Sequence, residues 1–82
     1  MKKLNLTNRE RVIIAVLISK MRSMTSQQVR DELEKQGTEI SRPTVAKDLE
    51  SLKRRKIVKT LGRRYRLINY QEAIKLVEEG AD

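Results

Sequence analysis

Residues 41–56 read SRPTVAKDLESLKRRK, and they predict a helix with two very different faces. Val45, Leu49 and Leu52 recur at the spacing i, i+4 and i+7, which lines them up along one side of an α-helix. The positions between them are mostly small, polar or charged, and the stretch ends in four consecutive cations. The helix should therefore bury a narrow apolar stripe and expose a broad, basic surface.

N-cap signals mark the starts of four helices. Thr7 and Thr25 each stand three residues before a Glu or Gln that can return the capping hydrogen bond, which is the capping-box pattern. Gly37 is a natural end for the second helix. The predicted helices cover residues 8–20, residues 26–36, the segment that Ser41 caps with Pro43 in its first turn, and the segment that Asn69 opens and Gly80 closes.

The segments between these helices predict a short turn and a hairpin. Only residues 38–40 separate the second and third helices, which is the helix-turn-helix arrangement, and Ile40 should plug the turn. After the third helix, residues 57–61 and 64–68 are β-branched or alternating, and Gly62-Arg63 between them suits a tight two-residue loop. A β-hairpin should therefore follow the third helix.

The second strand of this hairpin should have an inner and an outer face. Tyr65 and Leu67 alternate with Arg64 and Arg66, so the apolar pair should face the core and the arginines the solvent. The order of elements is then helix, helix, helix, strand, strand, helix. This order predicts an α+β fold that is mainly α.

These elements resemble the winged helix-turn-helix superfamily of transcription regulators. Three stretches carry the resemblance. SRPTVAKDL at 41–49 looks like the recognition helix of arginine-repressor-type DNA-binding domains, and TV at 44–45 with the leucines at 49 and 52 is similar to ferric-uptake-regulator N-terminal domains. IV at 57–58 with GRRYRL at 62–67 looks like a generic wing. The resemblance implies that the third helix enters the DNA major groove and that the wing follows the backbone. The resemblance covers about residues 7–68, and we expect residues 1–68 to form a winged helix-turn-helix domain with three helices and a two-stranded wing.

The positive charge is concentrated in one block. Residues 42–66 hold ten of the 19 Lys and Arg but only two acids, so this block carries the whole net charge of +8. Such a block favours a polyanionic partner, with a merely solvated charged face as the alternative. The resemblance favours Arg42, Ala46 and Lys47 as the residues that read bases. The full set that we expect to contact DNA is Ser26, Gln27, Arg42, Pro43, Thr44, Ala46, Lys47, Ser51, Arg54, Lys59, Arg63, Arg64 and Arg66.

Several partner and function classes are disfavoured by composition. The chain has two Tyr and no Phe or Trp, whereas single-strand binders rely on aromatic stacking, so double-stranded DNA is favoured. With no His or Cys, no glycine-rich phosphate loop and no paired buried carboxylates expected, we predict no enzyme activity, metal site, cofactor or small-molecule ligand. No signal peptide or membrane span is evident, which predicts a cytoplasmic protein.

The first helix suggests a homodimer. Residues 12–18 are apolar around the whole helix, although a helix facing one core needs only a stripe. The C-terminal segment, residues 69–82, could join it in one self-complementary dimerisation patch, or could instead fold back and cover the first helix. The residues expected in the patch are Ile13, Leu17, Tyr70, Ala73, Ile74 and Val77.

Together these features predict a sequence-specific, double-stranded DNA-binding transcription regulator that acts as a homodimer. A repressor is favoured over an activator, because 82 residues leave no room for a separate activation module. Two alternatives stay open: a DNA-architectural protein that binds without sequence preference, and a winged-helix module for protein interaction.

Overall fold

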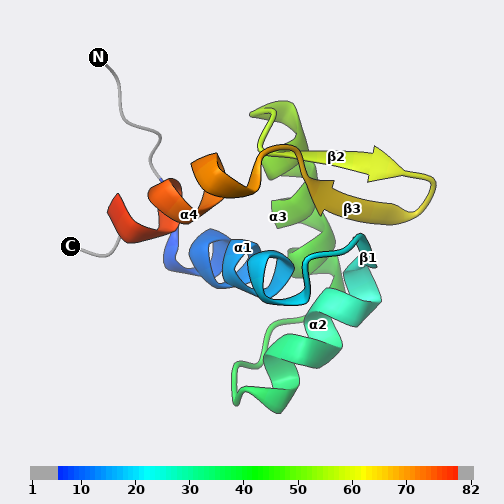
Figure 1. Cartoon of the computed structure of the whole chain (residues 1–82). Helices are drawn as coiled ribbons and strands as arrows, with labels where there is room; N and C mark the ends of the chain where they lie inside the picture. The colour runs from blue at the N-terminus through cyan, green and yellow to red at the C-terminus, as the bar shows by residue number, and fades with distance from the viewer. Residues whose placement is uncertain (1–5, 80–82) are drawn as a thin grey trace.

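The computed structural model describes residues 6–79 and shows four helices with a small antiparallel sheet (Figure 1). The third helix is followed by the hairpin, and the chain then returns in a final helix that lies across the first. The elements in chain order are α1 (Asn8–Lys20), β1 (Met24–Thr25), α2 (Ser26–Lys35), α3 (Arg42–Arg54), β2 (Val58–Leu61), β3 (Arg64–Leu67) and α4 (Tyr70–Glu79). The predicted mainly α architecture with a hairpin after the third helix is confirmed.

The predicted capping signals set the helix starts. The side-chain oxygen of Thr7 accepts from the Glu10 amide at 3.0 Å, and the Glu10 carboxylate accepts from the Thr7 amide at 2.9 Å. Thr25 begins α2 with the same reciprocal pair of bonds. Ser41 caps α3, and Asn69 accepts from the backbone amide at the third position of α4. Each cap satisfies an amide that has no partner inside its helix.

Two helices end in left-handed residues with the same pair of hydrogen bonds. After α2, Gly37 has φ 86° and the amide of Thr38 reaches back to the carbonyl of Leu33 at 2.9 Å. After α3, Lys56 takes this place with φ 63°, and the amide of Ile57 reaches the carbonyl of Leu52 at 3.0 Å. This arrangement is the Schellman motif, in which glycine is the usual left-handed residue. Gly80, the expected end of the last helix, lies outside the described residues.

The sheet contains one strand more than predicted. Its order is β1-β3-β2, so that β3 is the central strand, with Met24 of β1 opposite Tyr65. A two-residue strand is too short to show an alternating pattern, which is why the sequence did not indicate β1. The hairpin turns at Gly62-Arg63 as predicted, and the extra strand ties the wing to the segment before α2.

The core lies around α1. The predicted stripe of Val45, Leu49 and Leu52 is fully buried, and Ile40 packs against the same core from the turn. α4 folds back onto α1, which was the alternative to a dimer patch. This corrects one expectation: Ile13 and Leu17 have no surface left for a second copy of the chain, because their own chain covers them completely.

The other four residues of the expected dimer patch lie on α4 and differ in exposure. Ala73 is buried, and Tyr70 and Val77 are half-buried against the core. The hydroxyl of Tyr70 is buried as well, so only the apolar side chain of Ile74, 40% exposed, offers substantial surface.

Candidate nucleic-acid interface

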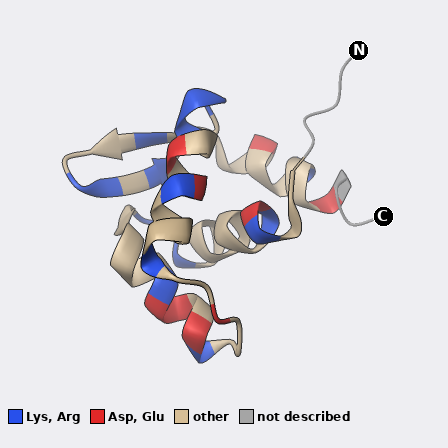
Figure 2. Ribbon diagram, turned by 180° about the vertical axis from the view of Figure 1, so that it is seen from behind, with Lys and Arg blue, Asp and Glu red and all other residues tan. Residues whose placement is uncertain are grey.

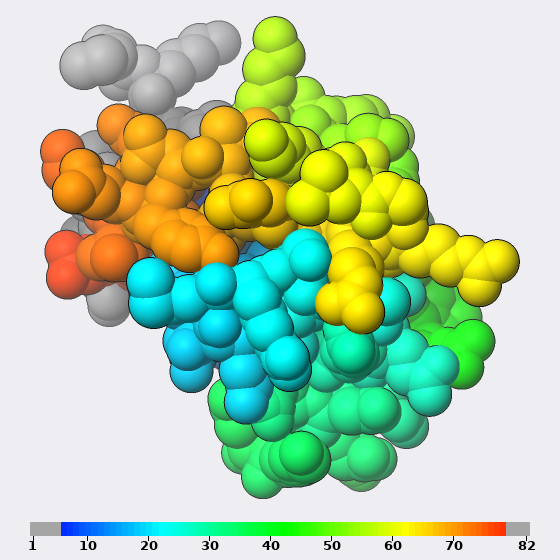
Figure 3. Space-filling view, turned by 45° about the vertical axis from the view of Figure 1, so that its right-hand side comes forward, coloured from blue at the N-terminus to red at the C-terminus, as the bar shows by residue number. Residues whose placement is uncertain are grey.

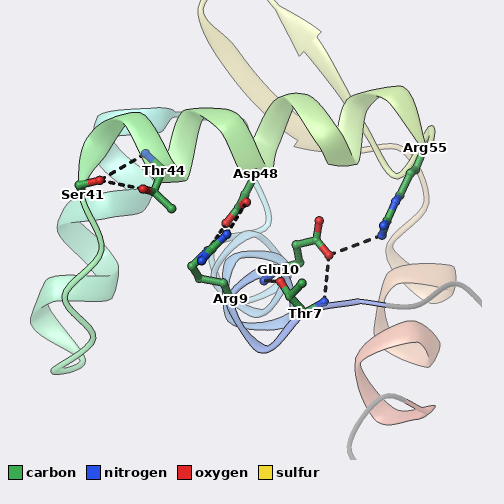
Figure 4. Close-up of polar contacts among 7 residues, drawn as sticks. All are labelled: Thr7, Arg9, Glu10, Ser41, Thr44, Asp48 and Arg55. Carbon is green, nitrogen blue, oxygen red and sulfur yellow. Dashed lines mark hydrogen bonds and ion pairs between the residues drawn. The ribbon is translucent and has the colours of Figure 1, made fainter.

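One face of α3 is clamped to the start of α1 by two charge pairs (Figure 4). Arg9 donates to both oxygens of Asp48, at 2.6 and 3.2 Å, and Arg55 lies 3.5 Å from Glu10. Asp48 and Arg55 are seven residues apart, about two helical turns, so they lie on the same face of α3. The two pairs therefore fix which face of α3 points away from the body.

The clamp uses buried carboxylates. Asp48 is 6% exposed and Glu10 is 4% exposed, and a buried carboxylate is tolerated only when it is paired. The hydrogen bond and the charge of Asp48 raise the pKa of Arg9 above its ordinary value. The sequence alone did not predict this clamp, because the partner of Asp48 lies 39 residues away in the chain. The position of Asp48 three residues after Val45, beside the apolar stripe, was the available signal.

The face of α3 opposite its buried stripe of Val45, Leu49 and Leu52 carries part of the expected interface. Pro43, Lys47 and Arg54 are exposed, while Ala46 and Ser51 are half-buried at the edges of this face. Spacings of four and seven residues place these three exposed side chains on one side of the helix. We call this surface, Pro43, Lys47 and Arg54 with their half-buried neighbours, the outer face of α3.

The starts of α2 and α3 are joined by a hydrogen bond. Arg42 donates to the side-chain oxygen of Gln27 at 3.2 Å, so two residues expected to contact DNA also contact each other. Thr44 is half-buried, and its hydroxyl lies 2.8 Å from that of Ser41, so its polar group already belongs to the cap of α3. Arg42 and Gln27 remain exposed beyond their mutual bond.

An open cleft of about 500 Å³ lies between these helix starts and the wing. In the space-filling view the yellow wing tip projects beyond the body, next to the teal and green starts of α2 and α3 (Figure 3). The cleft thus brings together expected residues from three separate segments. Its lining comprises Thr25, Ser26, Gln27, Arg42, Gly62, Arg63 and Tyr65.

The wing places like charges opposite each other. Lys59 of β2 and Arg66 of β3 are direct partners in the sheet, and both are exposed. Like charges in this position destabilise a hairpin, so the pair does not serve folding. Arg63 is exposed at the tip, and Arg64 beside it donates to the carbonyl of Ser23 at 3.5 Å. The ribbon coloured by charge shows this positive character along the hairpin and at the C-terminal end of α3, while acidic residues lie on the helices and none on the hairpin strands (Figure 2).

Glu50 is a residue that sequence reasoning did not select. It is exposed on α3, and its Oε2 accepts a 2.8 Å hydrogen bond from the hydroxyl of Tyr65 on the central strand. Burial of the phenol, and next this hydrogen bond, raise the pKa of Tyr65 to about 12. Tyr65 therefore stays protonated at neutral pH and joins the wing to α3.

Other kinds of site are not seen in the described part of the chain. Residues 6–79 hold no group of three or more His, Cys, Asp or Glu that could bind a metal ion. Within the same residues, no helix is long and apolar enough to cross a bilayer.

Comparisons of the chain with known proteins gave no match. No protein-family model, no curated protein and no solved structure is similar enough to count as a relative.

Proposed function

We propose that this protein is a sequence-specific, double-stranded DNA-binding transcription regulator of winged helix-turn-helix type. The observation that carries the proposal is the placement of Lys59 and Arg66 directly opposite each other on the exposed hairpin that follows α3. Such a pair costs folding stability, and a polyanion that neutralises both charges removes the cost. The wing is therefore built for a charged partner.

The two surfaces have different roles in this proposal. The outer face of α3 enters the major groove, which is wide enough for a helix, and Lys47 donates to guanine O6 or N7. Arg63 and the Lys59–Arg66 pair contact phosphates or the adjacent minor groove. The clamp formed by Arg9 with Asp48 and by Glu10 with Arg55 holds α3 in the orientation that exposes its outer face.

The placement of the aromatic residues supports a duplex over a single strand. Both Tyr are half-buried, and Tyr65 packs against the core from the wing. Neither ring is an exposed platform on which unpaired bases could stack. The chain has no Phe or Trp to provide one.

A homodimer remains part of the proposal, with a smaller patch than the sequence suggested. Ile68 and Ile74, 51% and 40% exposed, are the large exposed apolar side chains in and just before α4. We infer that the surface around Ile68 and Ile74, which we call the outer face of α4, pairs with the same surface of a second copy. Two copies would then present two α3 helices to the two halves of a symmetric site, and occupation of that site would repress transcription by excluding other proteins.

Selection from a random duplex pool tests the proposed function. The full chain is expected to enrich one sequence pattern, and the enriched duplex should outcompete a scrambled duplex and the corresponding single strand. Equal competition by scrambled duplex would contradict sequence-specific regulation and favour an architectural role. Absence of binding to any duplex would overturn DNA binding altogether.

A further inference from the structure

Glu50 has an unusual position for an acid. Lys47 precedes it by three residues and Arg54 follows it by four, so all three side chains lie on neighbouring positions of one helix surface. Within residues 6–79, however, Glu50 forms no ion pair with either cation. Its carboxylate is instead turned toward the wing, where it accepts from the hydroxyl of Tyr65 at 2.8 Å.

The negative charge of Glu50 is not required by the fold. The residue is exposed, and an amide oxygen could accept the same hydrogen bond from Tyr65. Asp48, the other acid among residues 42–66, is buried and paired with Arg9. Glu50 is thus the one carboxylate that this block exposes beside the outer face of α3. There it opposes phosphates, which weakens contact with DNA in general.

We propose that Glu50 determines sequence specificity by accepting a hydrogen bond from the exocyclic amino group of a cytosine in the major groove. This inference rests on the proposed DNA-binding function. Carboxylates recognise cytosine N4 in this way, because that amine is a donor on the exposed base edge. The same negative charge disfavours binding positions on the duplex that bring a phosphate next to it. Glu50 therefore increases the ratio between the affinities for correct and incorrect sites.

Tyr65 acts as the positioning residue for Glu50. Its hydroxyl donates to Oε2, so that Oε1 is the atom that would accept from the cytosine amine. Because Tyr65 belongs to β3, the central strand between β1 and β2, the carboxylate is held by the sheet as well as by its own helix. A fixed carboxylate discriminates between base edges better than a mobile one.

Selection from a random duplex pool with three variants tests this role. Glu50→Gln removes the charge and keeps the shape, Tyr65→Phe removes only the hydroxyl, and Glu39→Gln removes an exposed negative charge from the turn before α3 as a matched control. The unmodified chain should require a C·G pair at one position. In Glu50→Gln, this preference should fall at least about fivefold and move toward A·T, since Gln recognises adenine. Its affinity for scrambled duplex should rise severalfold.

The other variants separate specificity from general effects. Tyr65→Phe should weaken the preference at the same position and leave the other positions unchanged, with a circular dichroism spectrum like that of the unmodified chain. Glu39→Gln should leave every preference unchanged. If Glu50→Gln selects the same sequence as Glu39→Gln, the inference about Glu50 is wrong while sequence-specific binding stands. If the unmodified chain selects no sequence, the proposed function fails, and the role of Glu50 fails with it.

Discussion

Arg9 and Asp48 form a two-pronged ion pair between α1 and α3, with Nε to Oδ2 at 2.6 Å and Nη2 to Oδ1 at 3.2 Å. The two partners differ in exposure: the side chain of Arg9 is 48% exposed, and that of Asp48 is 9% exposed. Water can therefore solvate Arg9 without its partner, whereas Asp48 without Arg9 is a buried, uncompensated charge.

This difference predicts an asymmetry between the single variants. Arg9→Met should lower the urea midpoint of unfolding more than Asp48→Leu does, because only Arg9→Met leaves a buried charge unpaired. The double variant should recover most of the loss, since an apolar pair needs no compensation. Arg22→Met, which removes an exposed cation after α1, is the control and should change the midpoint little. Equal, additive losses from the two single substitutions would show that the pair does not act as a clamp.

Lys56 should be a site of stored backbone strain. Its φ of 63° is in the left-handed region, and its side chain is exposed. Lys56→Gly should raise the free energy of unfolding by about 0.5–1 kcal/mol, because relief of the left-handed strain exceeds the entropy that glycine costs. Lys53→Gly, inside the last turn of α3, should instead lower it by about 1 kcal/mol. Urea unfolding of both variants checks the opposite signs, and destabilisation by Lys56→Gly would contradict this account of the helix end.

The fold was largely predictable because its signals are local. Each capping box needs residues only three positions apart, and the stripe of Val45, Leu49 and Leu52 repeats with the period of one helix. The missed features depend on partners that are distant in sequence: β1 pairs with a strand about 40 residues later, and the partner of Asp48 precedes it by 39 residues. In the candidate site, exposure of Lys47 could be predicted from helical periodicity and that of Arg63 from its place in the hairpin turn, whereas the contact of Glu50 with Tyr65 depends on how the wing packs. The sequence could not predict that α4 folds back over Ile13 and Leu17, because an apolar helix can be covered either by its own chain or by a second copy.

Glu32 should contribute to the acid sensitivity of the fold. Its hydrogen bond to Lys20, with Nζ and Oε2 2.9 Å apart, is the main cause that lowers the pKa of this carboxyl below 4.5. The folded state thus favours the carboxylate, so the stabilisation is present above the unfolded pKa and disappears as the pH falls through the folded pKa. From about pH 5 to about pH 3, the unmodified chain should lose more stability than Glu32→Gln. Parallel stability curves for the two proteins over this range would contradict the role of the Lys20–Glu32 pair.

Ile74 should report on self-association. It is exposed on α4 and lies outside the buried core, so Ile74→Glu should leave the fold intact. If the outer face of α4 forms the dimer, the substitution should shift the sedimentation coefficient toward that of a monomer and weaken binding to the selected duplex. Gln71→Glu is the control, since it adds the same charge at an exposed polar position of α4. An unmodified chain that sediments as a monomer at high micromolar concentration would remove the dimer from the account.

Lys47 and Arg63 should differ in what they contribute to DNA binding. Lys47→Ala should cost about 1–3 kcal/mol on the selected duplex and relax the preference at one base pair, because Lys47 lies on the outer face of α3. Arg63→Ala should weaken selected and scrambled duplexes about equally, because in the proposed complex the wing tip contacts phosphates or the adjacent minor groove and does not read the major-groove base edges. Both side chains are exposed, so neither substitution should alter thermal stability appreciably. If Lys47→Ala weakens both duplexes equally, α3 does not read the sequence.

We propose above all that the basic block of residues 42–66 is the DNA-contact surface. The salt dependence of duplex affinity is the measurement that tests this proposal. If about five to eight phosphates are neutralised by each protomer, the logarithm of the association constant should fall against the logarithm of salt concentration with a slope of about −4 to −7 per protomer. Arg63→Ala should reduce the magnitude of this slope by about 1. A slope near zero for the unmodified chain, with the protein folded at every salt concentration, would contradict the claim.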